Sequence, residues 1–218
     1  MEEKILTYET DEITVTYDVN RCIHAAECVK GLKSVFNPDR RPWIQPEHES
    51  VENVAEVVKR CPTGALKFKS NSDELEEETP AQVNTIAVSA DGPVYFRGNI
   101  EVQSADGEVL LKDTRFALCR CGHSGNKPAC DNTHSEIDFE APGHFSRSNL
   151  TKGAEDDHEK LLLKVMEDGP LIVEGSYQIY SNATQPVSSS KNIALCRCGG
   201  SGNKPFCDGT HKEIGFEG

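Results

Sequence analysis

Polar and apolar residues alternate along the first part of the chain in a pattern typical of a strand. Residues 12–19 read Glu-Ile-Thr-Val-Thr-Tyr-Asp-Val, with an apolar side chain at every second position. A period of two residues predicts a half-buried β-strand, which leads the chain to Cys22. A short helical segment is expected from Glu27 to Leu32, and a further strand from Ala65 to Phe68.

A longer period predicts a helix over residues 51–60. Apolar side chains recur at positions i, i+3, i+4 and i+7 and form one face: Val51, Val54, Ala55 and Val58. Ser50 can cap the first turn, and Pro62 cannot continue the helix. The helix therefore presents Cys61 at its end.

A run of carboxylates ends this pattern. Between Lys69 and Pro80 the chain carries five acidic residues: Asp73, Glu74, Glu76, Glu77 and Glu78. Such a run is typical of a solvated linker, although an exposed helix face has the same composition. We expect a first domain over residues 1–70 and a linker over residues 71–80.

Beyond the linker, the sequence repeats itself at a spacing of 77 residues without a gap. Residues 83–88 match 160–165, and the tripeptide Asp-Gly-Pro occurs at both 91–93 and 168–170. Gly-Pro and Asp-Gly pairs predict short strands joined by tight turns, followed by a loop and a short helix. We expect one module over residues 81–141, a connector over residues 142–159 and a second module over residues 160–218.

Each module is small, so we expect the two modules to stabilise each other. A unit of about sixty residues is marginal alone. Two sister units in one chain can cover each other's apolar faces as the subunits of a two-fold dimer do. The predicted fold class is α+β, with a small N-terminal domain and two β-rich modules packed as an intrachain pseudo-dimer. A monomer with internal pseudo-two-fold symmetry is expected.

Composition and charge narrow the function classes. Hydrophobic residues make up 36% of the chain, which is low for one large core, so small units held partly by metal are favoured. The net charge of −13 argues against nucleic-acid binding, which needs a basic stripe, and suits a protein partner with a basic surface. The N-terminus shows no signal peptide and no stretch approaches the roughly 20 apolar residues of a membrane span. We therefore expect a cytoplasmic protein that does not enter membranes.

Nine cysteines are many for a reducing compartment, and an odd number cannot all pair as disulfides. They fall into three groups of three, at positions 22/28/61, 119/121/130 and 196/198/207. Clustered cysteines near histidines indicate metal ligation. The grouping suggests three metal sites.

The last two groups each gain a histidine at the same spacing. The two repeated candidate ligand sets are Cys119, Cys121, Cys130 and His134, and Cys196, Cys198, Cys207 and His211. We expect the residue that follows Asp131 or Asp208, which is Asn132 or Gly209, to adopt a left-handed conformation, because Asn and Gly tolerate positive φ best. Either aspartate can accept backbone N–H bonds and start the short helix that orients the histidine. Because Cys130 and His134 are four residues apart, we expect a helical turn to place them on one face. Three thiolates and an imidazole could hold zinc or an iron–sulfur cluster.

The longer pattern resembles a known family. Residues 196–211 read Cys-Arg-Cys-Gly-Gly-Ser-Gly-Asn-Lys-Pro-Phe-Cys-Asp-Gly-Thr-His, which is similar to the CDGSH iron–sulfur domain of the NEET family. Residues 119–134 match with Asn132 where the family usually has Gly, and both copies have Thr where Ser is commoner. The resemblance covers residues 80–218 and implies a 2Fe–2S cluster in each module. It places two cysteines on one iron and a cysteine with a histidine on the other, in modules paired around a shared β-rich cap.

The first group resembles a different family. Cys22-Ile-His-Ala-Ala-Glu-Cys28 and the distant Cys61-Pro62 are similar to a single-cluster bacterial-type ferredoxin, with Ala25 at the middle cysteine position. Residues 12–70 look like the divergent ferredoxin domain found fused to CDGSH modules. The resemblance implies a 3Fe–4S cluster, or a 4Fe–4S cluster with a labile or non-cysteine fourth ligand, for which His24 is a candidate. Zinc, or no metal, is the alternative at this site.

These patterns predict an iron–sulfur protein that transfers one electron at a time and is not an enzyme, since no nucleophile–base pair, phosphate loop or organic-cofactor motif is present. A cluster donor or a redox or pH sensor is the second hypothesis, because an imidazole ligand couples cluster charge to a proton. A zinc-stabilised interaction module is the third. Expected partners are redox proteins or apo-proteins that accept a cluster.

Overall fold

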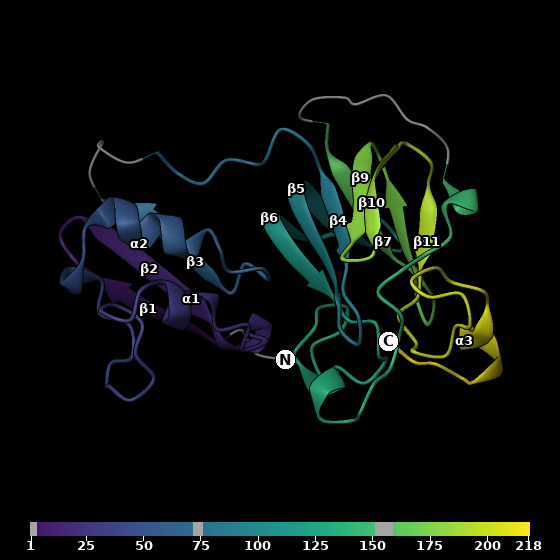
Figure 1. Cartoon of the computed structure of the whole chain (residues 1–218), viewed down its shortest axis with the longest axis horizontal. Coiled ribbons are helices and arrows are strands. Elements are labelled where there is room, and N and C mark those ends of the chain that lie inside the picture. The colour runs from purple at the N-terminus through teal and green to yellow at the C-terminus, as the bar shows by residue number, and fades with distance from the viewer. Residues whose placement is uncertain (1–3, 72–75, 151–158) are drawn as a thin grey trace. The chain divides into compact units, whose positions relative to one another are not determined.

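The computed structural model describes residues 4–71, 76–150 and 159–218 (Figure 1). The chain divides into two compact units, Met1–Thr79 and Pro80–Gly218. Both units consist mostly of sheet with few helices, which confirms the α+β class. Residues 72–75 of the expected linker and residues 151–158 of the expected connector lie outside the described residues.

The first unit is a three-stranded antiparallel sheet with two helices. Its strands β1 (Ile5–Glu9), β2 (Ile13–Asp18) and β3 (Leu66–Ser70) follow one another in that order across the sheet. The helices are α1 (Glu27–Gly31) and α2 (Val51–Val58), with short 3-10 turns η1 (Val19–Arg21) and η2 (Pro46–His48). The predicted strands and helices are therefore present, with ends shifted by up to two residues.

Ser50 caps α2 as predicted, because its Oγ accepts a hydrogen bond from the backbone N–H of Asn53 at 3.4 Å. The apolar face of α2 packs into the core of this unit, where Val54 and Val58 are fully buried beside Val15.

Strand β1 was not predicted. It pairs with β2 at the edge of the sheet and leaves Ile5 and Leu6 exposed, so its sequence lacks the alternation that marked β2.

The second unit contains one eight-stranded sheet built from both repeats. The first repeat supplies β4 (Thr85–Val88), β5 (Val94–Ser104) and β6 (Val109–Leu118). The second supplies β7 (Leu161–Val165), β8 (Leu171–Glu174), β9 (Tyr177–Ser181), β10 (Thr184–Ser189) and β11 (Ile193–Leu195). The strand order is β10-β9-β4-β5-β7-β8-β11, with β6 paired to β5. The helical pieces are η3 (Thr133–Ser135), η4 (Arg147–Asn149) and α3 (Thr210–Glu213).

The strands of the two repeats are interleaved through two parallel pairings. β4 pairs with β9, with Ile86 opposite Ile179, and β5 pairs with β7, with Val102 opposite Leu163. Adding 77 to Ile86 gives Leu163, and adding 77 to Val102 gives Ile179. A shift of 77 residues therefore converts each pairing into the other, and β4 and β5 of the first repeat lie between β9 and β7 of the second.

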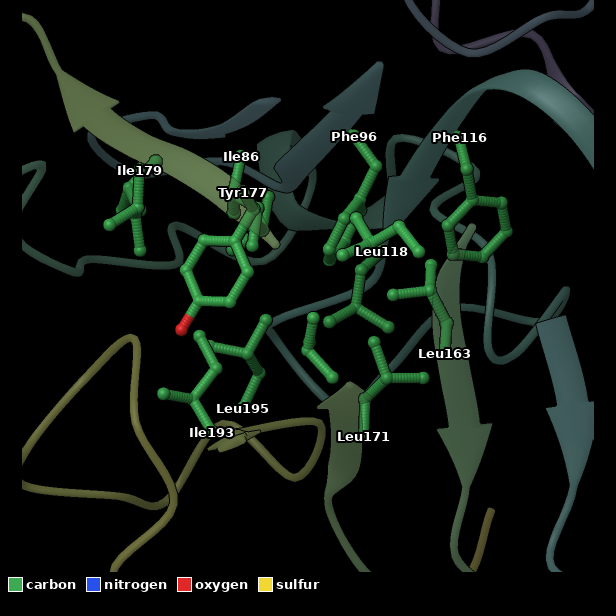
Figure 2. Close-up of a cluster of buried hydrophobic side chains, with 14 of the residues drawn as sticks. Ile86, Phe96, Phe116, Leu118, Leu163, Leu171, Tyr177, Ile179, Ile193 and Leu195 are labelled. Atoms are coloured by element: carbon green, nitrogen blue, oxygen red, sulfur yellow. The ribbon is translucent and has the colours of Figure 1, made fainter. Parts of the chain in front are cut away.

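One hydrophobic core serves both repeats. Figure 2 shows Phe96, Phe116 and Leu118 of the first repeat beside Leu163, Leu171 and Leu195 of the second, all of them buried. Segment 142–150, expected to be a connector only, also contributes to this core. Its Phe145 is buried and meets Phe206 edge-to-face, with ring centroids 6.2 Å apart.

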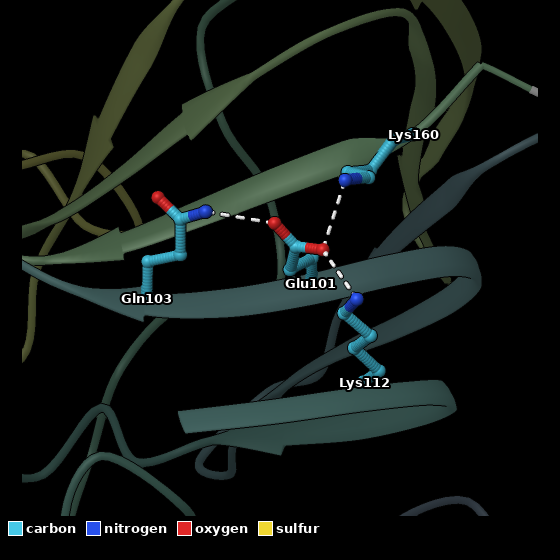
Figure 3. Close-up of polar contacts among 4 residues, drawn as sticks. All are labelled: Glu101, Gln103, Lys112 and Lys160. Atoms are coloured by element: carbon cyan, nitrogen blue, oxygen red, sulfur yellow. Dashed lines mark hydrogen bonds and ion pairs between the residues drawn. The ribbon is translucent and has the colours of Figure 1, made fainter. Parts of the chain in front are cut away.

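A group of ionic side chains interrupts the symmetry on β5. Glu101 is buried beside the ammonium groups of Lys160 at 2.8 Å and Lys112 at 3.6 Å, and Gln103 donates to it at 2.7 Å (Figure 3). The equivalent of Glu101 in the second repeat is the neutral Gln178. This charged group therefore occurs at only one of the two equivalent positions.

Within the described ranges, no helix is both long enough and apolar enough to cross a membrane.

Candidate metal centres

Backbone pairing brings the two halves of each repeated motif together. The N–H of Cys119 donates to the carbonyl of Pro128 at 2.9 Å, and the N–H of Cys130 donates to the carbonyl of Ala117 at 2.8 Å. In the second repeat Cys196 and Cys207 make the equivalent bonds, each at 2.8 Å. The intervening loop is closed by a serine hydroxyl, Ser124 or Ser201, which donates to a backbone carbonyl at 2.7 Å.

The candidate ligands meet as two pairs in each repeat. The sulfurs of Cys119 and Cys121 are 3.6 Å apart, and the sulfur of Cys130 is 3.4 Å from Nδ1 of His134. In the second repeat the sulfurs of Cys196 and Cys198 are 3.7 Å apart, and the sulfur of Cys207 is 3.4 Å from Nδ1 of His211. Both imidazoles therefore face a neighbouring sulfur.

A left-handed residue orients each histidine. Asn132 has φ 79° and Gly209 has φ 95°, which confirms the conformation predicted between aspartate and histidine. Asp131 accepts a hydrogen bond from the N–H of Thr133 at 3.0 Å, and Asp208 accepts one from Thr210 at 3.1 Å, so both aspartates start the turn as predicted. Burial alone would raise the pKa of Asp131, but its hydrogen bonds from Thr133 and Gly125 outweigh burial and lower it.

One detail of the prediction was wrong. Cys130 and His134 were expected to share a face of one helical turn. The helical turn begins only at Thr133, after the left-handed Asn132, so Cys130 lies outside it. The pair meets because the chain reverses at Asn132 and not because of helical spacing.

Burial shifts the pKa values of Cys130, Cys196 and His134 toward their uncharged forms. It raises the pKa of Cys130 to about 12 and also raises the pKa of Cys196. Burial lowers the pKa of His134, so its neutral form, which can bind a metal, is favoured. Buried thiols stay protonated at neutral pH unless a bound cation stabilises the thiolate.

The spacing of the pairs distinguishes between metal groups. Among the residues that the structure describes, no three His, Cys, Asp or Glu side chains lie close enough to share one metal ion. A tetrahedral zinc ion would need all four ligands around one centre. A binuclear cluster takes one pair of ligands on each iron, as mixed cysteine–histidine clusters do. Each repeat therefore offers two pairs of candidate ligands, a donor set that mixed cysteine–histidine clusters use.

The N-terminal unit brings its three cysteines to one hollow. Cys22, Cys28 and Cys61 line a cavity of about 650 Å³, together with His24 and Ala25. Burial is the main cause that raises the pKa of Cys28 to about 11, and the neighbouring Cys61 and Cys22 contribute to this rise. Ala25, at the middle cysteine position, leaves this hollow with three protein thiols, and the exposed His24 lies at its wall. The donor set fits a cluster with three cysteine ligands.

Sequence reasoning missed residues that join the two repeated sites. A Cβ atom at Gly122 would lie 2.5 Å from the carbonyl oxygen of Cys198, and one at Gly199 would lie 2.3 Å from that of Cys121. The two C-x-C segments are therefore in contact. The residue inside each segment, Arg120 or Arg197, is buried. Arginine at the same place in both repeats was the signal that could have marked it.

Two family models match the chain. The model described as "Divergent 4Fe-4S mono-cluster" matches residues 8–71. The model described as "Iron-binding zinc finger CDGSH type" matches twice, over residues 91–135 and 168–212. All candidate ligands fall inside these three ranges.

Two curated relatives match part of the chain. The "Uncharacterized protein YjdI" of Escherichia coli (strain K12) is 39% identical over 62 residues, which are 28% of this chain and 82% of that protein. The protein of the same name from Escherichia coli O157:H7 matches with the same values. No solved structure matches the chain significantly.

Proposed function

The chain belongs to the iron–sulfur proteins that join a divergent 4Fe–4S mono-cluster domain to two CDGSH domains, and from this premise we propose that it carries electrons one at a time. Each CDGSH module would hold a 2Fe–2S cluster, and the N-terminal unit would hold a 3Fe–4S or a 4Fe–4S cluster. Redox proteins are the partners in this proposal. The three clusters supply the redox chemistry, and the chain binds, orients and shields them.

The ligands are assigned by their pairing. One iron of each 2Fe–2S cluster would be held by the two cysteines of a C-x-C segment, Cys119 with Cys121 or Cys196 with Cys198. The other iron would be held by a cysteine and Nδ1 of a histidine, Cys130 with His134 or Cys207 with His211. The N-terminal cluster would be held by Cys22, Cys28 and Cys61.

The separation of the ligands into two pairs carries this proposal. The pairs are 3.4–3.7 Å wide, and among the described residues no three potential ligands can share one ion. Two irons bridged by sulfide take one pair of ligands on each iron, whereas one zinc ion takes all four ligands around one centre. The proposal includes a pseudo-dimeric packing of the two modules. The pairings of β4 with β9 and of β5 with β7 support it, because a shift of 77 residues converts one pairing into the other.

Metal analysis of protein purified without oxygen tests the proposal. We expect about two irons and two inorganic sulfides for each CDGSH module, a coloured solution, and an EPR signal after reduction by dithionite. A folded, colourless chain that contains zinc and no sulfide would exclude both electron transfer and cluster donation.

The N-terminal assignment has a separate test. Ala25 lines the same cavity as the three cysteines, so the substitution Ala25→Cys adds a thiol at the position that ferredoxin spacing reserves for one. We expect the variant to retain a 4Fe–4S cluster in air, where the unmodified chain yields a 3Fe–4S EPR signal. Identical spectra of the two chains would count against a cluster at this site.

Cluster donation is the second candidate, because His134 and His211 are only half-buried and solvent protons can reach them. Incubation of the loaded protein with an apo-ferredoxin, followed by absorbance of the separated proteins, tests it. Transfer of the cluster to the ferredoxin favours donation, and retention of the cluster by this chain favours electron transfer alone.

A further inference from the structure

A buried hydroxyl group lies beside one of the three thiols of the N-terminal unit. Thr63 is 3% exposed and lines the same cavity as the three cysteines. Its Oγ lies 3.6 Å from the sulfur of Cys61, which is a hydrogen-bond distance for an atom as large as sulfur. Pro62 stands between the two residues and has no backbone N–H to donate. The hydroxyl of Thr63 is therefore in reach of this sulfur where the intervening residue offers it no donor.

The backbone determines which role the oxygen of Thr63 plays. The N–H of Ala65 donates to this Oγ at 3.2 Å, so one of its lone pairs is already used as an acceptor. A threonine hydroxyl also carries one proton that it can donate. Because Thr63 is buried, a hydroxyl proton without an acceptor would lose the hydrogen bond that water gives it in the unfolded chain. The sulfur of Cys61 is an acceptor that lies in reach of that proton.

Ionisation of Cys61 decides the direction of this hydrogen bond. In a chain without metal, either the thiol or the hydroxyl can be the donor. A cysteine binds iron as a thiolate, which has no proton to give. In the loaded chain the hydroxyl of Thr63 would therefore donate and the sulfur of Cys61 would accept.

Contacts with a second segment hold Thr63 in this position. Nη2 of Arg21 donates to the carbonyl of Thr63, and the N–H of Asp18 donates to the carbonyl of Ala65 at 2.8 Å. Arg21 directly precedes Cys22, another candidate ligand. The segment that carries Cys61 is thus attached to the segment that carries Cys22, so the position of the hydroxyl does not depend on its own turn alone.

We propose that Thr63 raises the reduction potential of the N-terminal cluster by donating a hydrogen bond to the sulfur of Cys61. Reduction adds one electron, converts one Fe³⁺ to Fe²⁺ and breaks no bond, so the cluster and its sulfur ligands gain one negative charge. A donor that points at a ligand sulfur stabilises this added charge, and it does so more strongly where water is excluded. Thr63 acts through Cys61 and is not itself a ligand. The inference rests on the three-cysteine cluster proposed above.

The test uses the full chain after exposure to air, in which we expect a 3Fe–4S EPR signal from the N-terminal unit. This signal belongs to the oxidised cluster, whereas the 2Fe–2S clusters give theirs after reduction, so the clusters can be told apart. An EPR-monitored redox titration compares the unmodified chain with Thr63→Val and Thr63→Ser. We expect Thr63→Val, which replaces the hydroxyl by a methyl group, to lower the midpoint potential. Thr63→Ser keeps the hydroxyl and should restore most of the loss.

Thr16→Val is the matched control, because it makes the same exchange in the same unit. Thr16 lies on the face of β2 opposite to the buried Val15 and Tyr17, so we expect no change of midpoint potential. An unchanged potential in Thr63→Val, or an equal loss in Thr63→Ser, would overturn the inference. An unmodified chain that gives no signal of a three-iron or four-iron cluster would instead overturn the proposed function of the N-terminal unit.

A second measurement leaves Thr63 in place and so covers a variant that does not bind a cluster. The unmodified chain is transferred briefly into D₂O, and its oxidised N-terminal cluster is examined by pulsed EPR. A hydroxyl proton exchanges quickly, whereas buried amide protons exchange only when the structure opens. We expect a proton that is coupled to the cluster and is replaced by deuterium in this short time. The absence of such an exchangeable proton would overturn the inference.

Discussion

The imidazoles of His134 and His211 are the residues through which protons reach the two repeated sites. Each faces a cysteine sulfur through Nδ1 at 3.4 Å and is only half-buried. Burial lowers the pKa of His134, so its neutral form persists to a lower pH than in a free histidine. Acid below that pKa protonates the ring and removes the lone pair with which Nδ1 would bind iron in the proposed site.

We predict that His134→Cys slows the loss of the first cluster in acid and lowers its reduction potential, because thiolate replaces a protonatable neutral ligand. The measurements are the decay of visible absorbance between about pH 8 and about pH 5 and a redox titration. His123→Gln is the control. It changes an imidazole that lies 2.9 Å from the carbonyl of Cys121 but faces no sulfur, and its decay should match that of the unmodified chain. Equal decay in His134→Cys would remove His134 from the ligand set.

At this scale the sequence predicted much of each repeated site. Ligand spacing, the left-handed Asn132 and Gly209, and the aspartate caps all follow from local chemistry, because each depends on residues a few positions away. The burial of Arg197 and the contact of Gly122 with Cys198 do not follow from local chemistry. They depend on contacts between segments 77 residues apart, which no local pattern encodes.

Among the elements, the contact between the two C-x-C segments leaves no room for a side chain at Gly122 or Gly199. Gly122 has φ 83° and its missing Cβ would lie 2.5 Å from the carbonyl oxygen of Cys198. A side chain here would strain the backbone and also push the opposite segment away. A substitution in one repeat should therefore disturb the sulfur positions of both.

We predict that Gly122→Ala lowers cluster content in both modules and destabilises the chain by more than the cost of the conformation alone. Gly107→Ala isolates that cost of about 1–2 kcal/mol, because Gly107 also has positive φ (93°) but has no atom near its missing Cβ. Iron content and thermal unfolding of both variants are compared. Similar losses in the two variants would show that the segments do not press on each other.

The ionic group on β5 adds a pH-dependent contribution to the parallel pairing of β5 with β7. The hydrogen bond from Lys160 is the main cause that lowers the pKa of Glu101. A carboxyl whose pKa is lower in the folded chain stabilises that chain above its unfolded value of about 4.3, and this stabilisation is lost as the pH falls below it.

We predict that Glu101→Gln lowers the melting temperature near neutral pH, while the difference from the unmodified chain shrinks as the pH falls below about 4. Circular dichroism melts across this range provide the measurement. Gln178→Glu is the matched control, because the equivalents of Lys160 and Lys112 are Val83 and Ser189, so the new carboxylate should destabilise at neutral pH. A difference for Glu101→Gln that does not depend on pH would contradict the assignment.

For the whole molecule, the interleaved sheet decides which parts can fold alone. β4 and β5 each need a strand of the second repeat, and the buried cluster in Figure 2 draws on both repeats. All strand pairings of β1, β2 and β3, by contrast, lie within the first unit. The repeat in the sequence indicated a pseudo-symmetric pair, but it could not indicate that β4 and β5 lie between strands of the second repeat, because strand order depends on the assembled sheet.

We predict that residues 80–150, expressed alone, form a homodimer. A second copy can offer residues 100–104 to β4 in place of the equivalent strand β9. Size-exclusion chromatography with light scattering measures the mass. Residues 1–79 are the control and should be monomeric, since their sheet is complete. A folded, cluster-loaded monomer of residues 80–150 would show that the first repeat does not need its sister.

The interleaving also sets an order of events on the ribosome. Thr85 pairs with Gln178, which is synthesised on the order of ten seconds later. During that interval the first repeat leaves the exit tunnel with open strand edges and with nothing against its C-x-C segment, while the N-terminal unit is already complete. The N-terminal unit can therefore fold first, whereas the sheet and the C-x-C contact of the second unit form only after translation has supplied the last strands.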